Sequence, residues 1–203
     1  IVGGFSGSRN TLDNYKGVAE IYDPIGGTFR PTGSLNTVRG VHRATAVYAT
    51  SFPLAAEGAA GAAGEDRVLI SGGYNASGFP TSLEWYHVGA GNFTTLSVAM
   101  ANVRALHTAV LLPNGKVLLA GGQTSSSLPY GTAAAELYDV ATNTIGPTGS
   151  LNESRGGQTA TLVNGRVIVC GGVSLSGFSI LTRSSVETYD PATGLFTTLL
   201  TPM

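Results

Sequence analysis

The chain has few charged side chains, no run of basic residues and no long apolar stretch. Only 11% of its 203 residues are Asp, Glu, Lys or Arg, and its net charge is −1, whereas about a quarter of a soluble domain is usually charged. Phosphate recognition needs clustered Lys or Arg, so the composition disfavours a nucleic-acid partner. A membrane-spanning helix needs about 18 uninterrupted apolar residues, and because the sequence has no such window, no membrane span is predicted.

Cysteine is nearly absent. Cys170 is the only one, which excludes an internal disulfide framework and any zinc site built from several cysteines. It lies in the apolar run Val-Ile-Val-Cys, where a small buried thiol is expected. The sequence begins at Ile1 without an initiator Met or a cationic and apolar leader. We therefore expect the chain to be processed or to be a piece of a longer one.

Glycine is abundant, and four Gly-Gly pairs mark an internal repeat. The chain has 29 glycines without the every-third-residue period of collagen. Each pair follows a short run rich in β-branched residues. The pairs are Gly3 and Gly4, Gly72 and Gly73, Gly121 and Gly122, and Gly171 and Gly172. The last three pairs are 49 and 50 residues apart, which indicates a unit of about 50 residues.

Two further landmarks follow each pair in a fixed order. The first is a Glu-x-Tyr segment, at Glu20 and Tyr22, Glu84 and Tyr86, Glu136 and Tyr138, and Glu187 and Tyr189. The second is a strand led by arginine, which three units reach 17 or 18 residues after the tyrosine, at Arg39, Arg104 and Arg155. We expect a single domain with repeats at about 1–67, 68–116, 117–166 and 167–203.

Apolar residues within a unit recur with a period of two, which indicates strands rather than helices. Two β-branched runs flank Asn164-Gly165, and Asn114-Gly115 has a similar setting. Asn-Gly favours a type I′ hairpin because that turn needs positive φ at both central residues. Each unit thus supplies four short antiparallel strands. The sequence predicts an all-β fold, a β-propeller built of four-stranded antiparallel blades.

The Gly pairs, the Glu-x-Tyr-Asp segments and the stretch Arg104-Ala-Leu-His107-Thr-Ala resemble the kelch repeat of kelch proteins and galactose-oxidase-like propellers. The resemblance covers nearly the whole chain and implies a kelch-type propeller. It is weak for activity, since such propellers include both binding scaffolds and enzymes.

One arginine strand is missing from the set of four. It is expected near position 206, beyond Met203, so a closed ring would lack one strand at the join. We expect the chain to be part of a longer propeller of six or seven blades. The alternative is a four-blade unit that completes itself with another chain.

The recurring residues are interpreted as structural. Glycine permits close approach of the inner strands and positive φ. The repeated Glu and Arg side chains are predicted to form ion pairs between strands or blades, a role that suits the rigid fork of arginine. Because a functional site breaks the symmetry of a repeat, residues that occur in every unit are expected to belong to the framework.

The first unit carries an Ala/Gly-rich insertion at residues 49–66. Arg39 and Gly72 are 33 residues apart, whereas the corresponding distances in the next units are 17 and 16. We interpret the insertion as a tolerated surface loop. The alternative is a loop that contacts a partner.

The resemblance makes a specific demand of a copper radical oxidase, which carries a copper-ligating tyrosine in an Arg-Gly-Tyr-Gln context. The matching stretch is 155–158, Arg-Gly-Gly-Gln, so Gly157 replaces the tyrosine. His42 and His107 share one repeat position and are expected to be strand residues. His87 stands where other units have Asp. We therefore predict no catalytic residue, no metal and no cofactor.

Three N-glycosylation sequons fall in predicted loops or turns, at Asn75, Asn92 and Asn152. They are candidate glycan sites if the protein is secreted from a eukaryote. With only two lysines and many Thr, Ser and Gly residues, an extracellular or cell-surface location is favoured.

These observations predict a non-enzymatic structural or binding module. Its expected partners are a protein or a glycan bound through the rim loops, or further blades of the same propeller. The alternative is a degenerate or partial galactose-oxidase-like copper oxidase domain whose active site is lost or lies outside this chain.

Overall fold

The computed structural model describes residues 2–5, 15–48, 65–125, 131–176 and 179–199, and the regular elements within these ranges are all β-strands. The strands form one three-stranded sheet, three four-stranded sheets and a separate two-stranded hairpin, with antiparallel pairing throughout. In these ranges no helix is long and apolar enough to span a membrane. The predicted all-β fold of four-stranded antiparallel sheets is confirmed.

The first sheet has the order β1-β2-β3 and contains β1 (Val2–Phe5), β2 (Tyr15–Asp23) and β3 (Thr28–Thr32). The second has the order β4-β5-β6-β7 and contains β4 (Arg43–Val47), β5 (Arg67–Ser71), β6 (Ser82–His87) and β7 (Asn92–Ala99). The third has the order β8-β9-β10-β11 and contains β8 (Thr108–Leu111), β9 (Lys116–Ala120), β10 (Ala135–Asp139) and β11 (Thr144–Pro147). The fourth has the order β12-β13-β16-β17 and contains β12 (Thr159–Val163), β13 (Arg166–Cys170), β16 (Val186–Asp190) and β17 (Leu195–Thr198). The hairpin joins β14 (Val173–Ser176) to β15 (Ser179–Thr182).

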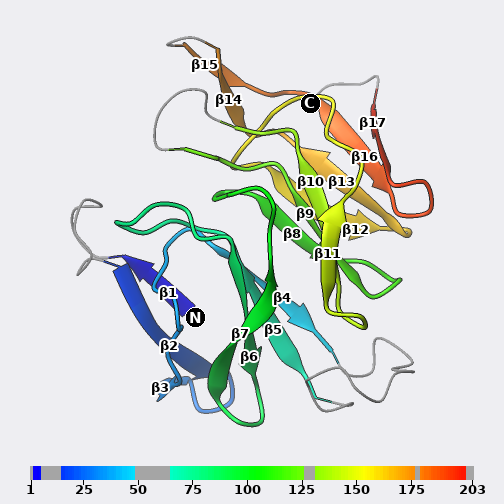
Figure 1. Cartoon of the computed structure of the whole chain (residues 1–203). Coiled ribbons are helices and arrows are strands. Elements are labelled where there is room, and N and C mark those ends of the chain that lie inside the picture. Colours follow the sequence, from blue (N-terminus) through cyan, green and yellow to red (C-terminus); the bar gives the residue numbers. More distant parts are fainter. Residues whose placement is uncertain (1, 6–14, 49–64, 126–130, 177–178, 200–203) are drawn as a thin grey trace.

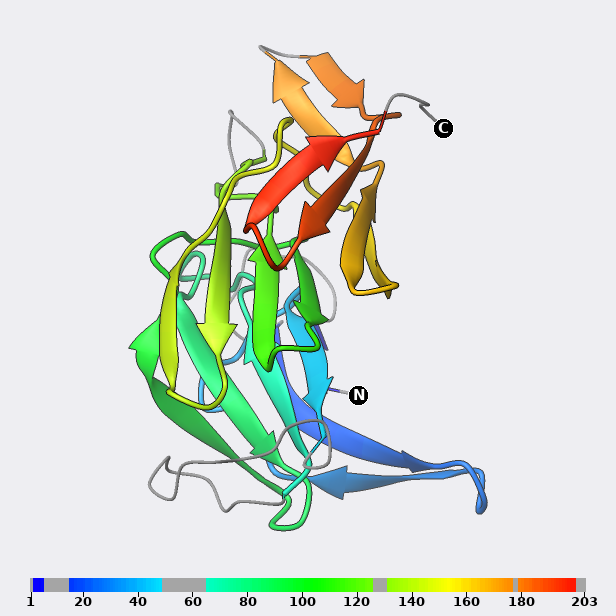
Figure 2. The same ribbon diagram turned by 90° about the vertical axis from the view of Figure 1, so that its right-hand side faces the viewer.

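The sheets follow one another in chain order, from the blue first sheet to the orange and red fourth sheet (Figure 1). The first strands of the four-stranded sheets meet, because β4 contacts β8 and β8 contacts β12. Turned by 90°, the sheets succeed one another from the bottom of the view to the top, with β14 and β15 projecting at the far end (Figure 2). The arrangement is propeller-like, with β4, β8 and β12 as the inner strands.

The sheets are offset by one strand from the sequence units. Each four-stranded sheet begins with the strand that follows an arginine and continues with the Gly-Gly strand of the next unit, as β4 pairs with β5. The insertion at 49–66 enters between β4 and β5, and its residues 49–64 lie outside the described residues. Hairpin β14–β15 occupies the polar loop of the fourth unit and was not predicted.

The two Asn-Gly turns differ. Asn164 and Gly165 have φ values of 48° and 79°, as a type I′ turn requires. The second predicted type I′ turn is wrong, since Asn114 is not among the residues with positive φ. There the Gly115 N–H donates to the Leu112 carbonyl at 3.1 Å and Gly115 has a φ of 83°. Pro113 fixes a negative φ at the first central position, so the chain makes a type I turn followed by a left-handed glycine.

Three apolar clusters fill the spaces between successive sheets. One lies between the first and second sheets, around Ile70 and Tyr86. The next lies between the second and third, around Trp85 and Leu119, and the last between the third and fourth, around Leu118 and Tyr189. Strands of the second and third sheets are therefore buried on both faces, which explains continuous apolar runs such as that of β9.

The Gly pairs have the positive φ that was predicted, but their close contacts are with connecting loops and not between inner strands. Both members of every pair have positive φ. A Cβ on Gly72 would overlap the carbonyl oxygen of Arg104 and come within 2.7 Å of the His107 ring. The N–H of Gly73 donates to that same Arg104 carbonyl at 2.9 Å. The first glycines of the first three pairs, Gly3, Gly72 and Gly121, thus let the loop that enters the next sheet pack directly on the backbone.

Candidate functional site

The arginines and three of the glutamates of the repeat form buried ion pairs. The pairs are Arg39–Glu84 at 2.9 Å, Arg104–Glu136 at 2.6 Å and Arg155–Glu187 at 2.8 Å. The prediction that the arginines begin strands is wrong, because each lies in a loop four residues before its strand. From that loop the guanidinium of Arg39 reaches both the Gly72 carbonyl, at 3.0 Å, and the Glu84 carboxylate.

These charges fasten each connecting loop to the sheet that it enters. Glu84 also accepts the backbone N–H groups of Asn36, at 2.7 Å, and Thr37, at 3.1 Å. Burial lowers the pKa of Arg39, and the charge of Glu84 opposes that effect. Removing one member of such a pair leaves a buried charge uncompensated, which costs about 3–5 kcal/mol. The repeated charges are therefore engaged within the framework.

The corresponding residues of the first sheet are more accessible. Glu20 is exposed and Tyr22 is 50% exposed, whereas Tyr86, Tyr138 and Tyr189 are buried.

Two of the three junctions between sheets are closed by the same segment, Pro-Thr-Gly-Ser-Leu-Asn at 31–36 and 147–152, which we call the clasp. In the first clasp the Gly33 N–H donates to the Gly91 carbonyl at 2.9 Å, and the Thr32 hydroxyl lies 2.7 Å from the Tyr86 hydroxyl. The second clasp repeats these contacts on Gly194, at 2.9 Å, and Tyr189, at 2.8 Å. Only glycine allows this approach, since a Cβ on Gly33 would lie 2.5 Å from the Gly91 oxygen.

The junction between the second and third sheets has no clasp. Val98 stands at the repeat position of Gly33, and Asn143 at that of Gly91. Two side chains thus replace the two glycines whose backbones touch elsewhere. Here the Tyr138 hydroxyl donates to the Asn143 side-chain oxygen at 3.1 Å, and the Asn143 amide donates to the Ser97 hydroxyl at 3.2 Å. Because side chains stand where the two backbones would touch, the backbones stay apart and leave room for a recess.

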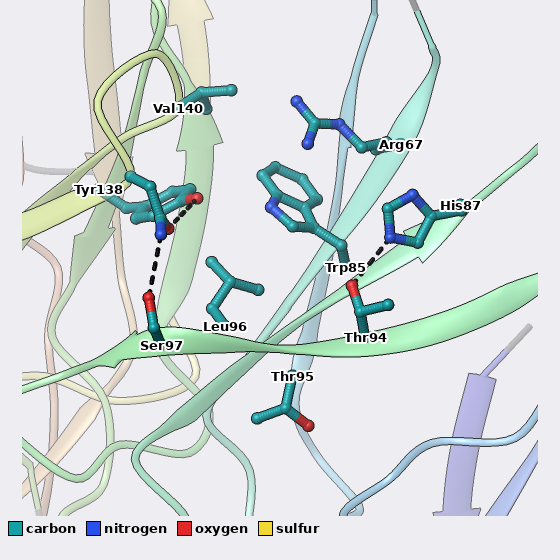
Figure 3. A pocket seen from close by; sticks show the side chains of 10 residues that line it. Arg67, Trp85, His87, Thr94, Thr95, Leu96, Ser97, Tyr138 and Val140 are labelled. Carbon is teal, nitrogen blue, oxygen red and sulfur yellow. Dashed lines mark hydrogen bonds between the residues drawn. The ribbon is translucent and has the colours of Figure 1, made fainter. Parts of the chain in front are cut away.

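A pocket of about 500 Å³ lies at this junction (Figure 3). Its walls come from the ends of β5 and β6 and from β7 on the second sheet, and from Tyr138, Val140 and Asn143 of the third. Trp85 and Leu96 supply apolar surface, while Thr94, Ser97 and Asn143 supply hydroxyl and amide groups. Burial raises the pKa of Tyr138 to about 12, so its hydroxyl stays protonated and acts as a donor.

Arg67 in this pocket lacks the partner that its counterparts have. Lys116 begins β9 and pairs with Asp139 at 2.7 Å, and Arg166 begins β13 and pairs with Asp190 at 3.0 Å. Arg67 begins β5 opposite His87, which replaces the aspartate. Its guanidinium lies 4.5 Å from the centre of the Trp85 ring.

His87 is turned toward other groups. Its Nδ1 lies 3.1 Å from the Glu65 carboxylate and its Nε2 lies 2.8 Å from the Thr94 hydroxyl. The hydrogen bond with His87 lowers the pKa of Glu65. The sequence shows that His87 replaces an aspartate, but the pocket was not predicted from it. The feature that could have indicated the pocket is the clasp segment, which is present at 31–36 and 147–152 and absent from 96–101.

The three sequons differ in their surroundings. The Asn75 amide donates to the Val38 carbonyl at 2.9 Å, and the Asn152 amide donates to Glu187 at 2.9 Å within the second clasp. Asn92, at the start of β7, is exposed. Asn92 is therefore the sequon best placed for a glycan, and its use stays a prediction.

Gly157 occupies a left-handed position of the repeat. Its φ is 70°, and its counterparts Val41 and Leu106 have φ values of 58° and 53°. The Gly157 N–H donates to the Leu106 carbonyl at 2.8 Å, which links the loops of successive sheets. Among the described residues, no group of three or more His, Cys, Asp or Glu side chains is placed to hold a metal ion.

Two expectations near this position are wrong. His42 and His107 are not strand residues, because each lies immediately before its strand. Cys170 is half-buried rather than buried. Its counterpart Ser71 is covered by His107 of the following sheet, and no following sheet covers Cys170 within the described part of the chain.

Comparison of the sequence with protein-family models and with curated proteins found no match. Solved structures do resemble the fold. One of them, described as "Structure of YjhT", superposes with a TM-score of 0.72 at 11% sequence identity. The match covers 97% of this chain and 65% of that one, so the chain spans about 65% of that protein's length. At this identity the likeness shows the fold alone.

Proposed function

We propose that the chain is a non-enzymatic binding module of the kelch type, which contacts a protein partner or a glycan at its rim. The observation that carries the proposal is the pocket at the second junction. The repeat closes the other two junctions with a clasp, whereas at this junction side chains replace the clasp glycines and border a recess. A departure from the repeat that creates a lined recess is where a binding site is expected.

The pocket has the chemistry of a recognition site. An indole, a phenol, hydroxyls and an amide surround about 500 Å³, a combination common where sugars or partner side chains bind. Glu65, from the end of the insertion, and the turn between β6 and β7 border the same region. We propose that partner contacts extend onto these rim loops.

No catalytic role is proposed. The alternative is a degenerate or partial copper oxidase domain whose active site is lost or lies outside this chain, since an intact site of that kind needs a tyrosine where Gly157 stands. Copper(II) added to the protein is expected to give no tyrosyl-radical absorption and no alcohol oxidation. Appearance of both would overturn this part of the proposal.

The pocket is tested by filling it. Thr94→Trp places an indole at the pocket wall, and Thr197→Trp is the matched control, because Thr197 has the same register on β17 of the fourth sheet. The probes are neutral sugars, N-acetylated sugars, small organic acids and their amides, titrated by calorimetry. We expect at least one probe to bind at one site per chain, with affinity reduced about tenfold or more by Thr94→Trp only. Absence of binding by every probe, or equal loss in both variants, would contradict the proposal.

A further inference from the structure

The pocket holds a buried cation whose framework partner has been replaced. Arg67 is only 9% exposed, and its Nε is buried without a hydrogen-bond partner. In the described part of the chain its guanidinium makes neither a hydrogen bond nor an ion pair. It lies against the Trp85 ring, and its charge acts at longer range on the Glu65 carboxylate and the Tyr138 hydroxyl. Its counterparts Lys116 and Arg166 both pair with an aspartate. Of the three basic residues at this repeat position, Arg67 is the one that has no aspartate partner in the described part of the chain.

The replacement of the aspartate leaves the Arg67 guanidinium without a carboxylate in direct contact, and Glu65 acts on it only at longer range. Burying a guanidinium is unfavourable unless an anion or several acceptors compensate it. Stacking on Trp85 supplies part of that compensation and leaves the N–H groups of the fork unused. Figure 3 shows the guanidinium above the indole, on the side of the pocket that also holds Val140. A ligand oxygen can reach the fork from the pocket.

The surroundings favour a single negative charge on an organic body. Glu65 bonds to His87 in the pocket wall and lies two residues before Arg67, so a second negative charge on the ligand would be repelled. Trp85, Leu96 and Val140 offer apolar surface to the remainder of such a ligand. The planar fork of arginine matches a carboxylate, which can accept two parallel hydrogen bonds.

We propose that this pocket binds the carboxylate of a small organic monoanion, with Arg67 as the anchor and Trp85 as the surface on which the ligand body stacks. This inference rests on the proposed binding function and names the ligand class of the same site. His87 is the residue that creates the site, because an aspartate there would occupy Arg67.

Carboxylates paired with neutral counterparts test the inference by calorimetry on the 203-residue chain. The probes are phenylacetate with phenylacetamide, glucuronate with glucose, and phenyl phosphate. We expect the carboxylates to bind more tightly than their neutral counterparts and than phenyl phosphate. Arg67→Gln should weaken carboxylate binding about tenfold or more, whereas Arg166→Gln, the same change at the matching position of β13, should leave it unchanged.

A second variant addresses the origin of the site. His87→Asp restores the residue found in the other sheets, and we expect it to pair with Arg67 and to weaken carboxylate binding about tenfold while the protein stays folded by circular dichroism. Equal binding of acids and amides, tighter binding of phenyl phosphate, or undiminished binding by both Arg67→Gln and His87→Asp would overturn the inference. If neutral sugars bind to the protein and Thr94→Trp weakens that binding, the proposed binding function stands even though the carboxylate inference fails. Absence of binding by every probe would contradict both proposals.

Discussion

Two histidines, the half-buried His42 and the buried His107, make the stability of the fold depend on pH. Burial lowers the pKa of His42 to about 4, and burial together with the charges of Arg104 and Arg43 lowers that of His107 well below its usual value. Between about pH 6.5 and pH 4 the unfolded chain binds protons at both residues, while the folded chain binds them far less. Stability therefore rises with pH across this window and falls as pH decreases from about 6.5 toward 4, by at most about 1.4 kcal/mol per pH unit for each histidine.

His107→Gln tests this dependence. Gln158 occupies the same repeat position in the next loop and donates to the Ala120 carbonyl at 2.9 Å, so the site tolerates glutamine. We expect the variant to fold and to lose about half of the pH dependence of the free energy of unfolding, measured by urea denaturation between pH 4.5 and 7.5. A slope equal to that of the unaltered protein would show that His107 does not titrate with unfolding.

Residues of the framework could be predicted from the sequence, and the pocket residues could not. Gly72, Glu84 and Arg39 recur at fixed spacing, so their ion pairs and close approach follow from the repeat. Arg67 is different, since its lack of an aspartate partner follows from the strand register that places it opposite His87. The sequence shows both residues but not their pairing, so an orphaned cation is not visible before strand register is known.

At the scale of the element, the clasp is expected to depend on glycine at one point of contact. A Cβ on Gly149 would overlap the carbonyl oxygen of Gly194, whereas a Cβ on Gly146, three residues earlier, meets nothing within 4 Å. Gly149→Ala should therefore force the third and fourth sheets apart and lower the free energy of unfolding by about 1–3 kcal/mol. Gly146→Ala, the control, should change it by less than about 0.5 kcal/mol. Equal effects of the two substitutions in urea denaturation would show that the clasp does not hold this junction.

Element boundaries were predictable where turn chemistry is unambiguous. Asn164-Gly165 gave the correct turn, while Pro113 changed the turn type beside Asn114-Gly115. The loops that carry Arg39 and Arg104 were predicted as strands because Val41 and Leu106 continue the apolar pattern of β4 and β8. Their left-handed residues, Val41 and Leu106, are not types that signal positive φ.

At the scale of the whole molecule, the all-β class and the four-stranded sheets followed from a repeat with period two. The offset between sequence unit and sheet followed less directly, because it depends on which strand pairs with which. The recess at the second junction depends on two substitutions 45 residues apart, Val98 and Asn143, that meet only after the sheets stack. Stacking of that kind is not encoded in local spacing.

The stacking of sheets also predicts unequal local stability. The second and third sheets have an apolar cluster on both faces, whereas in the described ranges the first and fourth have one on a single face. Tyr22 of β2 is 50% exposed, while its counterpart Tyr138 of β10 is 1% exposed. Local opening is easiest where few apolar contacts must be broken. In hydrogen exchange followed by mass spectrometry, amides of β5 and β9 should exchange last and those of β2 and β16 earlier, after correction for intrinsic rates. Equal protection in all four sheets would instead mean that the sheets open only as one cooperative unit, and that burial on both faces gives the inner sheets no separate stability.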